Sequence, residues 1–240
     1  MPNAIAELHK LREIGTHLAR RPRWLRHAWR WSQSLLAGRE PLADASPWVT
    51  FDCQAWLERW LAPTMRVFEW GSGGSTLFLA CRVRELVTIE HDERWASRVR
   101  ERLDADAQAR AHCDHRVVPA RRDAERTRAA HPAGAPHGTL DYRSSDEAWA
   151  GHVFDDYARA IDGYADESFD LVIVDGRARN ACVAHALPKV LRGGFLLLDN
   201  AERVEYQPSI ERLAAWPGMR FFGPGPYNTY PWETRVWRRP

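Results

Sequence analysis

Short apolar runs alternate with amphipathic stretches over most of the chain after Pro63. The apolar runs predict five strands, at residues 65–69, 85–90, 115–119, 169–174 and 195–198. The amphipathic stretches predict helices between and after them, at residues 75–81, 92–107, 147–162, 181–191 and 210–215. Strands that alternate with helices in this way predict an α/β fold, with a doubly wound parallel sheet covered on both faces.

The last two apolar runs, at residues 219–222 and 234–238, are different because only residues 223–233 separate them. A connection of that length has no room for a crossover helix, so these two runs predict an antiparallel hairpin at the end of the sheet. The connection is rich in Gly, Pro and aromatic residues. We expect it either to wall a binding pocket or to form a dimer contact. Residues 120–145 are predicted to be a long loop and a candidate lid, which carries His131 and His137.

The first forty residues carry helical patterns of their own. Two sets of apolar residues each fall on one helical face: Ile5, Leu8, Leu11 and Leu18, then Trp24, Ala28, Trp31 and Leu35. Pro22 separates the two sets and predicts a break between two helices. We therefore predict an N-terminal helical cap over residues 1–50 and a second, larger domain over residues 51–240.

Charge makes the cap distinct from the rest of the chain. Residues 1–40 hold 8 Lys and Arg against 3 Asp and Glu, whereas the whole chain of 240 residues is nearly balanced at +2. The overall balance argues against a polybasic nucleic-acid-binding protein and disfavours a nucleic-acid partner. The cap either packs its Trp face on the core or on a second copy in a homo-oligomer, or it offers a basic surface to anionic lipid, substrate or RNA.

The cysteines and the chain ends point to a cytoplasmic location. The four cysteines (Cys53, Cys81, Cys113 and Cys182) include no CxxC pair, so we expect reduced thiols rather than a zinc ribbon or a disulfide scaffold. No signal-peptide pattern and no apolar stretch of membrane-spanning length is evident.

A glycine-rich turn, Trp70-Gly71-Ser72-Gly73-Gly74, lies between the first predicted strand and its helix. Glycines there allow close approach of the backbone to a ligand, and the start of the helix offers free N–H groups to an anionic group. The match to the dinucleotide fingerprint is imperfect, because Thr76 stands at the third glycine position. No Gly-Lys-Ser/Thr follows, so a P-loop is excluded.

Two acidic residues narrow the ligand class. Glu90 ends the second predicted strand, 19 positions after Gly71, where doubly wound folds place an acid that binds ribose hydroxyls. Glu69 directly precedes the turn and would repel a pyrophosphate, which disfavours NAD. S-adenosylmethionine carries an ammonium and a sulfonium and no phosphate, so it suits this position better.

A second site is expected where the next two strands end. Asp175 follows one strand, and Asp199 and Asn200 follow the other. Because neighbouring parallel strands end at one edge, these side chains should meet in an all-oxygen cluster. Such a cluster favours Mg²⁺ or Mn²⁺ over zinc.

The pattern Glu69-x-Gly71-x-Gly73 followed by Glu90 resembles motif I and the strand-two acid of class I S-adenosylmethionine-dependent methyltransferases. The resemblance covers about residues 50–240 and implies their seven-stranded sheet. It also implies that the segment from Glu69 to Thr76, including Ser72 and Ser75, cradles the methionine part, and that Ala120 and Arg121 lie near adenine.

The trio Asp175, Asp199 and Asn200 resembles the metal site of catechol O-methyltransferase and related enzymes. This implies a small-molecule acceptor whose hydroxyl is held and activated by Mg²⁺ or Mn²⁺. The lysine expected three residues after the first Asp is Ala178 here. Arg177 is a poor base, so we expect it to orient an anionic substrate.

Three other functions stay open at this point. A metal-independent methyltransferase could act on nitrogen, RNA or a peptide. An NAD-dependent oxidoreductase would share the fold, and a non-catalytic binder could work through the basic cap.

Overall fold

The structure is a computed structural model that describes residues 2–123 and 140–240, with side chains from residue 9 onwards. The lid histidines His131 and His137 therefore lie outside the described residues. Seven strands form one sheet in the order β3-β2-β1-β6-β7-β9-β8. They are β1 (Arg66–Trp70), β2 (Glu85–Glu90), β3 (Cys113–Val117), β6 (Phe169–Val174), β7 (Val190–Leu198), β8 (Gly218–Gly223) and β9 (Trp232–Arg238).

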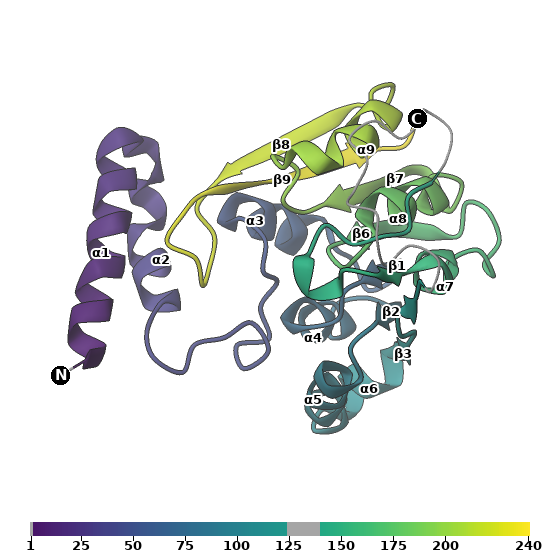
Figure 1. The fold of residues 1–240 in the computed structure, drawn as a ribbon, viewed down its shortest axis with the longest axis horizontal. Helices are drawn as coiled ribbons and strands as arrows, with labels where there is room; N and C mark the ends of the chain where they lie inside the picture. The colour runs from purple at the N-terminus through teal and green to yellow at the C-terminus, as the bar shows by residue number, and fades with distance from the viewer. Residues whose placement is uncertain (1, 124–139) are drawn as a thin grey trace.

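The sheet has the predicted topology (Figure 1). Strands β3, β2, β1, β6 and β7 are mutually parallel, whereas β9 pairs antiparallel with both β7 and β8. The order reverses at β1, where β2 lies on one side and β6 on the other. A doubly wound sheet binds its ligands at such a switch point, beyond the carboxyl ends of the strands.

Helices cover both faces of the sheet. One face packs against α3 (Phe51–Trp60), α4 (Gly74–Ala80), α5 (Glu93–Asp104) and α6 (Ala107–His112). The other packs against α7 (Asp155–Arg159), α8 (Arg179–Ala186) and α9 (Gln207–Arg212). Alternate residues of β1 serve the two faces: Val67 joins the first core, and Phe68 and Trp70 join the second. A strand buried on both sides needs this nearly continuous apolar run.

Some predicted elements are wrong. The helix predicted at 147–162 is instead a short 3-10 turn η2 (Glu147–Trp149), a two-residue strand β5 (His152–Val153) and α7. Gly151, with φ +75, breaks the helical path, and β5 pairs with β4 (Arg121–Arg122). The helix α3 is not among the predicted elements.

The predicted helix at residues 181–191 extends further than the observed helix α8. The helix stops at Ala186, and β7 begins at Val190, so the strand runs through Gly193 and Gly194. The pairing of β6 with β7 shifts register between Phe169 and Leu171, which accommodates the glycine pair.

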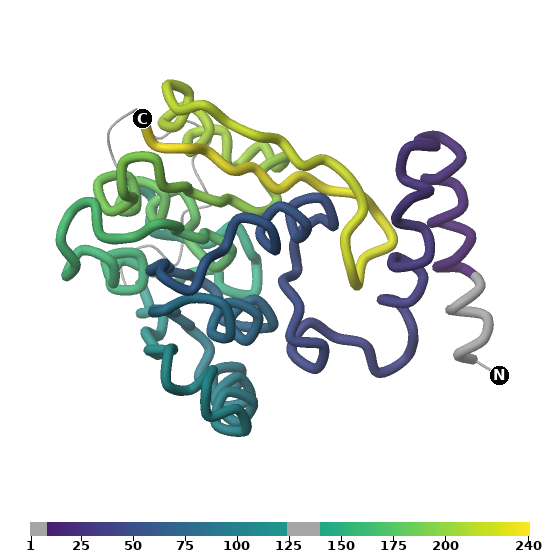
Figure 2. Tube along the Cα trace, turned by 180° about the vertical axis from the view of Figure 1, so that it is seen from behind, coloured from purple at the N-terminus to yellow at the C-terminus, as the bar shows by residue number. Residues whose placement is uncertain are grey.

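The cap consists of α1 (Pro2–Arg20), the 3-10 helix η1 (Pro22–His27) and α2 (Ala28–Ser34), so the break at Pro22 is confirmed. Figure 1 places these helices at one end of the molecule, and Figure 2 shows the loop between β8 and β9 reaching them. Trp31 donates its Nε1 proton to the Asn228 carbonyl at 2.6 Å, and the Tyr227 amide donates to Ser34 Oγ at 3.2 Å. None of the described helices is long and apolar enough to cross a membrane.

Candidate functional site

The glycine-rich turn that follows β1 is sterically constrained. Gly71 has φ +94, and a Cβ there would lie 3.0 Å from the backbone of Gly176. Gly176 is equally confined, because its own Cβ would come within 1.9 Å of the Tyr157 hydroxyl. The two glycines let the turns after β1 and β6 touch, which brings the two predicted sites side by side.

Glu69 lies beneath the turn and is fully buried. Its Oε2 accepts hydrogen bonds from Thr76 Oγ1 at 2.6 Å and Thr88 Oγ1 at 2.7 Å. Its Oε1 has no hydrogen-bond partner among the described residues. Burial raises the pKa of Glu69 to about 7, although the hydroxyl donors oppose the shift. The free oxygen is a buried acceptor without a donor, which is uncommon in folded proteins.

Glu90 ends β2 at the wall of the same region and is 3% exposed. Its Oε2 accepts the Ser72 amide at 3.0 Å, and its Oε1 accepts the amides of His91 and Asp92 at 2.8 and 3.0 Å. Burial alone would raise its pKa, but His91 and these amides outweigh burial and lower it. Glu90 is therefore a carboxylate held in one orientation.

A cavity of about 700 Å³ opens above these residues. Five of the predicted cofactor-binding residues line it: Gly71, Ser72, Gly73, Ser75 and Glu90. Glu69 and Thr76 do not; both lie buried below the turn, where Thr76 Oγ1 also accepts the Gly73 amide at 2.9 Å.

The predicted adenine contacts are placed differently. Neither Ala120 nor Arg121 lines the cavity. Arg121 is bonded to Asp155 and lies 3.2 Å from Asp156, because β4 pairs with β5 beside α7. The role of Ala120 and Arg121 beside adenine stays a prediction.

Three aromatic residues that sequence reasoning missed also line the cavity: Trp48, Trp95 and Trp149. Tyr227 lines it too and comes from the connection at residues 223–233, for which a pocket wall was one of the two expected roles. Trp95 donates its Nε1 proton to the Ser72 carbonyl at 2.6 Å, which pins α5 to the glycine-rich turn. The unusual count of 12 Trp was the available signal, but the residues come from separate segments that only the fold brings together.

A second cavity, of about 570 Å³, lies over the ends of β6 and β7. The predicted trio of Asp175, Asp199 and Asn200 does meet there. Four residues line both cavities, so the cavities adjoin: Trp48, Asp175, Gly176 and Arg177. Trp232, predicted to lie in the last loop, is the first residue of β9 and is buried against this site.

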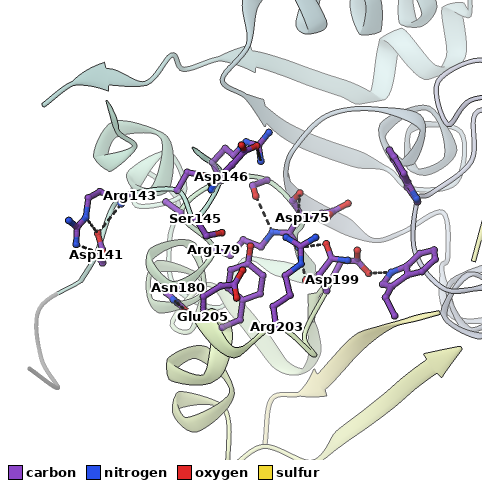
Figure 3. A pocket seen from close by; sticks show the side chains of 18 of the residues that line it. Asp141, Arg143, Ser145, Asp146, Asp175, Arg179, Asn180, Asp199, Arg203 and Glu205 are labelled. Atoms are coloured by element: carbon purple, nitrogen blue, oxygen red, sulfur yellow. Dashed lines mark hydrogen bonds and ion pairs between the residues drawn. The ribbon is translucent and has the colours of Figure 1, made fainter. Parts of the chain in front are cut away.

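Arg179 occupies the middle of the trio (Figure 3). Its Nε donates to the Gly176 carbonyl at 3.0 Å. Its Nη1 donates to the Asp199 carbonyl at 2.5 Å and to Asn200 Oδ1 at 3.3 Å. Its Nη2 donates to the Asp175 carbonyl at 3.0 Å and lies 2.9 Å from Asp175 Oδ1. A guanidinium has five N–H donors, so all of them are used.

The carboxylates are held by further partners. Asp199 Oδ1 accepts Trp232 Nε1 at 3.0 Å and the Thr234 hydroxyl. Burial and the neighbouring Asp175 charge raise the pKa of Asp199 to about 8. Burial also raises the pKa of Asp175, against the pull of Arg179.

The trio as arranged does not fit a divalent ion. Arg179 already contacts Asp175 Oδ1 and Asn200 Oδ1, and Asp199 Oδ1 accepts hydrogen bonds from Trp232 and Thr234 instead.

Arg177 stands at the boundary between the two cavities. Its Nη1 lies 2.9 Å from Asp146 Oδ2, and its Nε donates to His91 Nε2 at 3.4 Å. Arg177 therefore connects the residue next to Glu90 with the wall of the second cavity.

Comparisons with known proteins support the fold. No family model and no curated protein matches the chain. An rRNA methylase from Streptococcus thermophilus superposes with a TM-score of 0.50 at 13% identity, over 78% of this chain and 93% of that one. A methyltransferase-like protein from Silicibacter pomeroyi gives 0.43 at 24% identity, over 73% and 80%.

N-methyltransferase NodS from Bradyrhizobium japonicum gives a TM-score of 0.46 at 13% identity, over 77% of this chain and 89% of that one. At these identities the likeness concerns architecture. The strand order with its reversed β9 and the superposition on the rRNA methylase agree, and the chain has the Rossmann-like fold of class I methyltransferases.

Proposed function

We propose that the protein is an S-adenosylmethionine-dependent methyltransferase that acts on a small molecule, most simply at an oxygen. One observation carries the proposal: the cavity over the glycine-rich turn and Glu90 adjoins a second cavity at Asp175, Gly176 and Arg177. Methyl transfer needs two ligands held next to each other in this way.

The first cavity suits the cofactor in size and in chemistry. Its volume of about 700 Å³ lies within the range of ligand sites for molecules of this size. Glu90, a fixed carboxylate, would accept the ribose hydroxyls, and the turn from Gly71 to Ser75 would hold the methionine part. When bound, S-adenosylmethionine supplies an electrophilic methyl group on a positively charged sulfur. The buried Glu69 directly below the turn complements a cationic ligand and disfavours a pyrophosphate.

The second cavity would hold the acceptor. Its volume of about 570 Å³ fits a small molecule. Asp175 lines both cavities, and its Oδ1 is paired with Arg179. Its carboxylate would accept the proton of the acceptor hydroxyl while the acceptor oxygen bonds to the methyl carbon and the S–CH3 electron pair returns to sulfur. Arg177, on the boundary, would orient the acceptor.

We assign no step to a divalent ion, because Arg179 fills the space between the residues predicted to bind one. The metal-assisted mechanism expected from the resemblance to catechol O-methyltransferase thus has no support in this arrangement.

Calorimetry with S-adenosylhomocysteine and with NAD tests the proposal. We expect binding of S-adenosylhomocysteine and none of NAD; the reverse result would make the protein a dinucleotide-binding oxidoreductase instead. A panel of phenols, catechols and hydroxy acids, assayed by release of S-adenosylhomocysteine, would then identify the acceptor class. Turnover only with amines would assign methylation to nitrogen.

A further inference from the structure

The cluster at the ends of β6 and β7 has the oxygens of a cation site and a side chain in its centre. We propose that Arg179 permanently takes the place of a divalent ion there, so that the acceptor site is built to work without a metal. The inference rests on the proposed function, because only a bound acceptor gives this cluster its role.

The hydrogen bonds of Arg179 make the first argument. Three of its five N–H groups donate to backbone carbonyls, of Asp175, Gly176 and Asp199. Those carbonyls are positioned by the ends of β6 and β7, so they stay in place whatever the side chains do. The remaining two N–H groups reach Asp175 Oδ1 and Asn200 Oδ1, two of the oxygens that an ion would need. To bind there, an ion would have to displace a guanidinium that has no unmet donor.

The path of the backbone makes the second argument. Ala178 has φ +46, a left-handed conformation that costs energy for a residue with a Cβ. This turn starts α8 at Arg179 and aims its side chain back over the strand ends. The ring of Tyr206 lies 5.3 Å from the guanidinium carbon and covers the cluster from the side of η3 (Val204–Tyr206). Arg179 is only 8% exposed, so it is a built part of the site.

Charge makes the third argument. Arg179 brings a single positive charge and contacts the carboxylate of Asp175. Asp199 turns its Oδ1 toward Trp232 and Thr234 instead. A divalent ion held by the whole trio would draw on both carboxylates, whereas Arg179 contacts only that of Asp175. Because its donors are all used, Arg179 would not touch the acceptor. It is a positioning residue that holds Asp175 and stabilises its negative charge.

Binding of Mn²⁺ alone to the full-length protein, followed by electron paramagnetic resonance, tests the inference without any acceptor. We expect the wild type to bind no stoichiometric Mn²⁺ at millimolar concentration. Arg179→Ala should empty the space between the oxygens and bind Mn²⁺ at least about ten times more tightly than the wild type. The double variant Arg179→Ala, Asp175→Asn should lose that gain, and Arg177→Ala, in the same cavity, should show none.

Two results would overturn the inference. One is stoichiometric Mn²⁺ binding by the wild type that Asp175→Asn abolishes. The other is a folded Arg179→Ala, verified by circular dichroism, that gains no Mn²⁺ affinity; Arg179→Gln replaces it if the alanine variant does not fold. Calorimetry with S-adenosylhomocysteine on the same wild-type sample keeps the two proposals apart. If that ligand fails to bind, the proposed methyltransferase function is lost, whereas the Mn²⁺ result bears only on Arg179.

Discussion

The ends of β1 and β6 are neighbours in the sheet, and each carries an acidic residue. The two acids differ in the partners that the protein provides for them. Glu69 receives only neutral hydroxyl donors and keeps one oxygen without a partner among the described residues. Asp175 receives a buried arginine whose donors are all used. The first site therefore holds an acid that a cationic ligand could keep ionised, whereas the second site pairs its acid with an arginine of the protein itself. We therefore expect the positive charge of the cofactor to complement Glu69 and not Asp175, because Arg179 already pairs with Asp175.

The largest effect should come from the acid at the boundary of the two cavities. Asp175→Asn removes the proposed proton acceptor, and we expect turnover to fall by about 100-fold or more, because general-base catalysis is worth roughly that much. Binding of S-adenosylhomocysteine, measured by calorimetry, should change little. Asp104→Asn, which alters an exposed ion pair with Arg110, is the matched control. Loss of both ligand binding and turnover in this variant would contradict the proposal that one cavity holds the cofactor and the other holds the acceptor.

The next effect concerns the cofactor side alone. Glu90→Gln keeps the shape but removes the charge that would accept the ribose hydroxyls. Hydrogen bonds to a charged group are worth about 1.5–3 kcal/mol each, so the affinity for S-adenosylhomocysteine should fall on the order of 100-fold. Glu93→Gln changes an exposed acid in the first turn of α5 and should leave affinity unaltered. Equal affinities of the Glu90→Gln variant and the wild type for S-adenosylhomocysteine would show that the charge of Glu90 does not contribute to binding.

A smaller effect should follow from removing one of the hydrogen bonds to Glu69. Thr88→Val deletes a hydroxyl that donates to Glu69 Oε2, leaving that oxygen with the Thr76 hydroxyl as its donor. We expect the free energy of unfolding in urea to fall by about 2 kcal/mol, the usual cost of an unmet buried polar group. Thr88→Ser restores the donor and should recover most of the loss. A serine variant as unstable as the valine variant would point to packing of the methyl group instead.

The last prediction concerns pH. The pKa of Glu69 is about 7 in the folded protein, above its ordinary value of 4.5. Between these values the folded state holds a proton that the unfolded state has released. Stability should therefore fall as pH rises through this window, by up to about 1.4 kcal/mol per unit. Unfolding in urea at pH 5 and 7 should show a shallower fall in Glu69→Gln, and an unchanged slope would mean that Glu69 stays ionised throughout.

Much of the sheet could be predicted from the sequence because its strands are buried on both faces. The runs at Glu85–Glu90 and Phe169–Val174 were placed at their observed limits. The predicted helix at 147–162 failed because Gly151 turns the chain and His152–Val153 pairs with Arg121–Arg122, a partner distant in sequence. Local pattern carries no information on such pairing.

The candidate site, like the fold, could be predicted only in part. Gly71 and Glu90 belong to a short motif, and the structure places both at one cavity. No pattern in the sequence indicates that Arg179 enters the second site. Its position depends on the left-handed turn at Ala178 and on carbonyls from two strands. Such a convergence exists only once the chain has folded.

The contacts between the cap and the hairpin loop also constrain the order in which the molecule can assemble. Trp31 and its partner Asn228 are 197 positions apart. A ribosome makes the cap helices first and their docking loop almost last. Until then Trp24, which ends up 2% exposed, lacks its contact with Phe222, and Trp31, although packed with other residues of the N-terminal region, lacks its hydrogen bond to Asn228. The cap should therefore be the last part of the chain to settle during synthesis, and premature termination near residue 220 would leave its tryptophans open to aggregation.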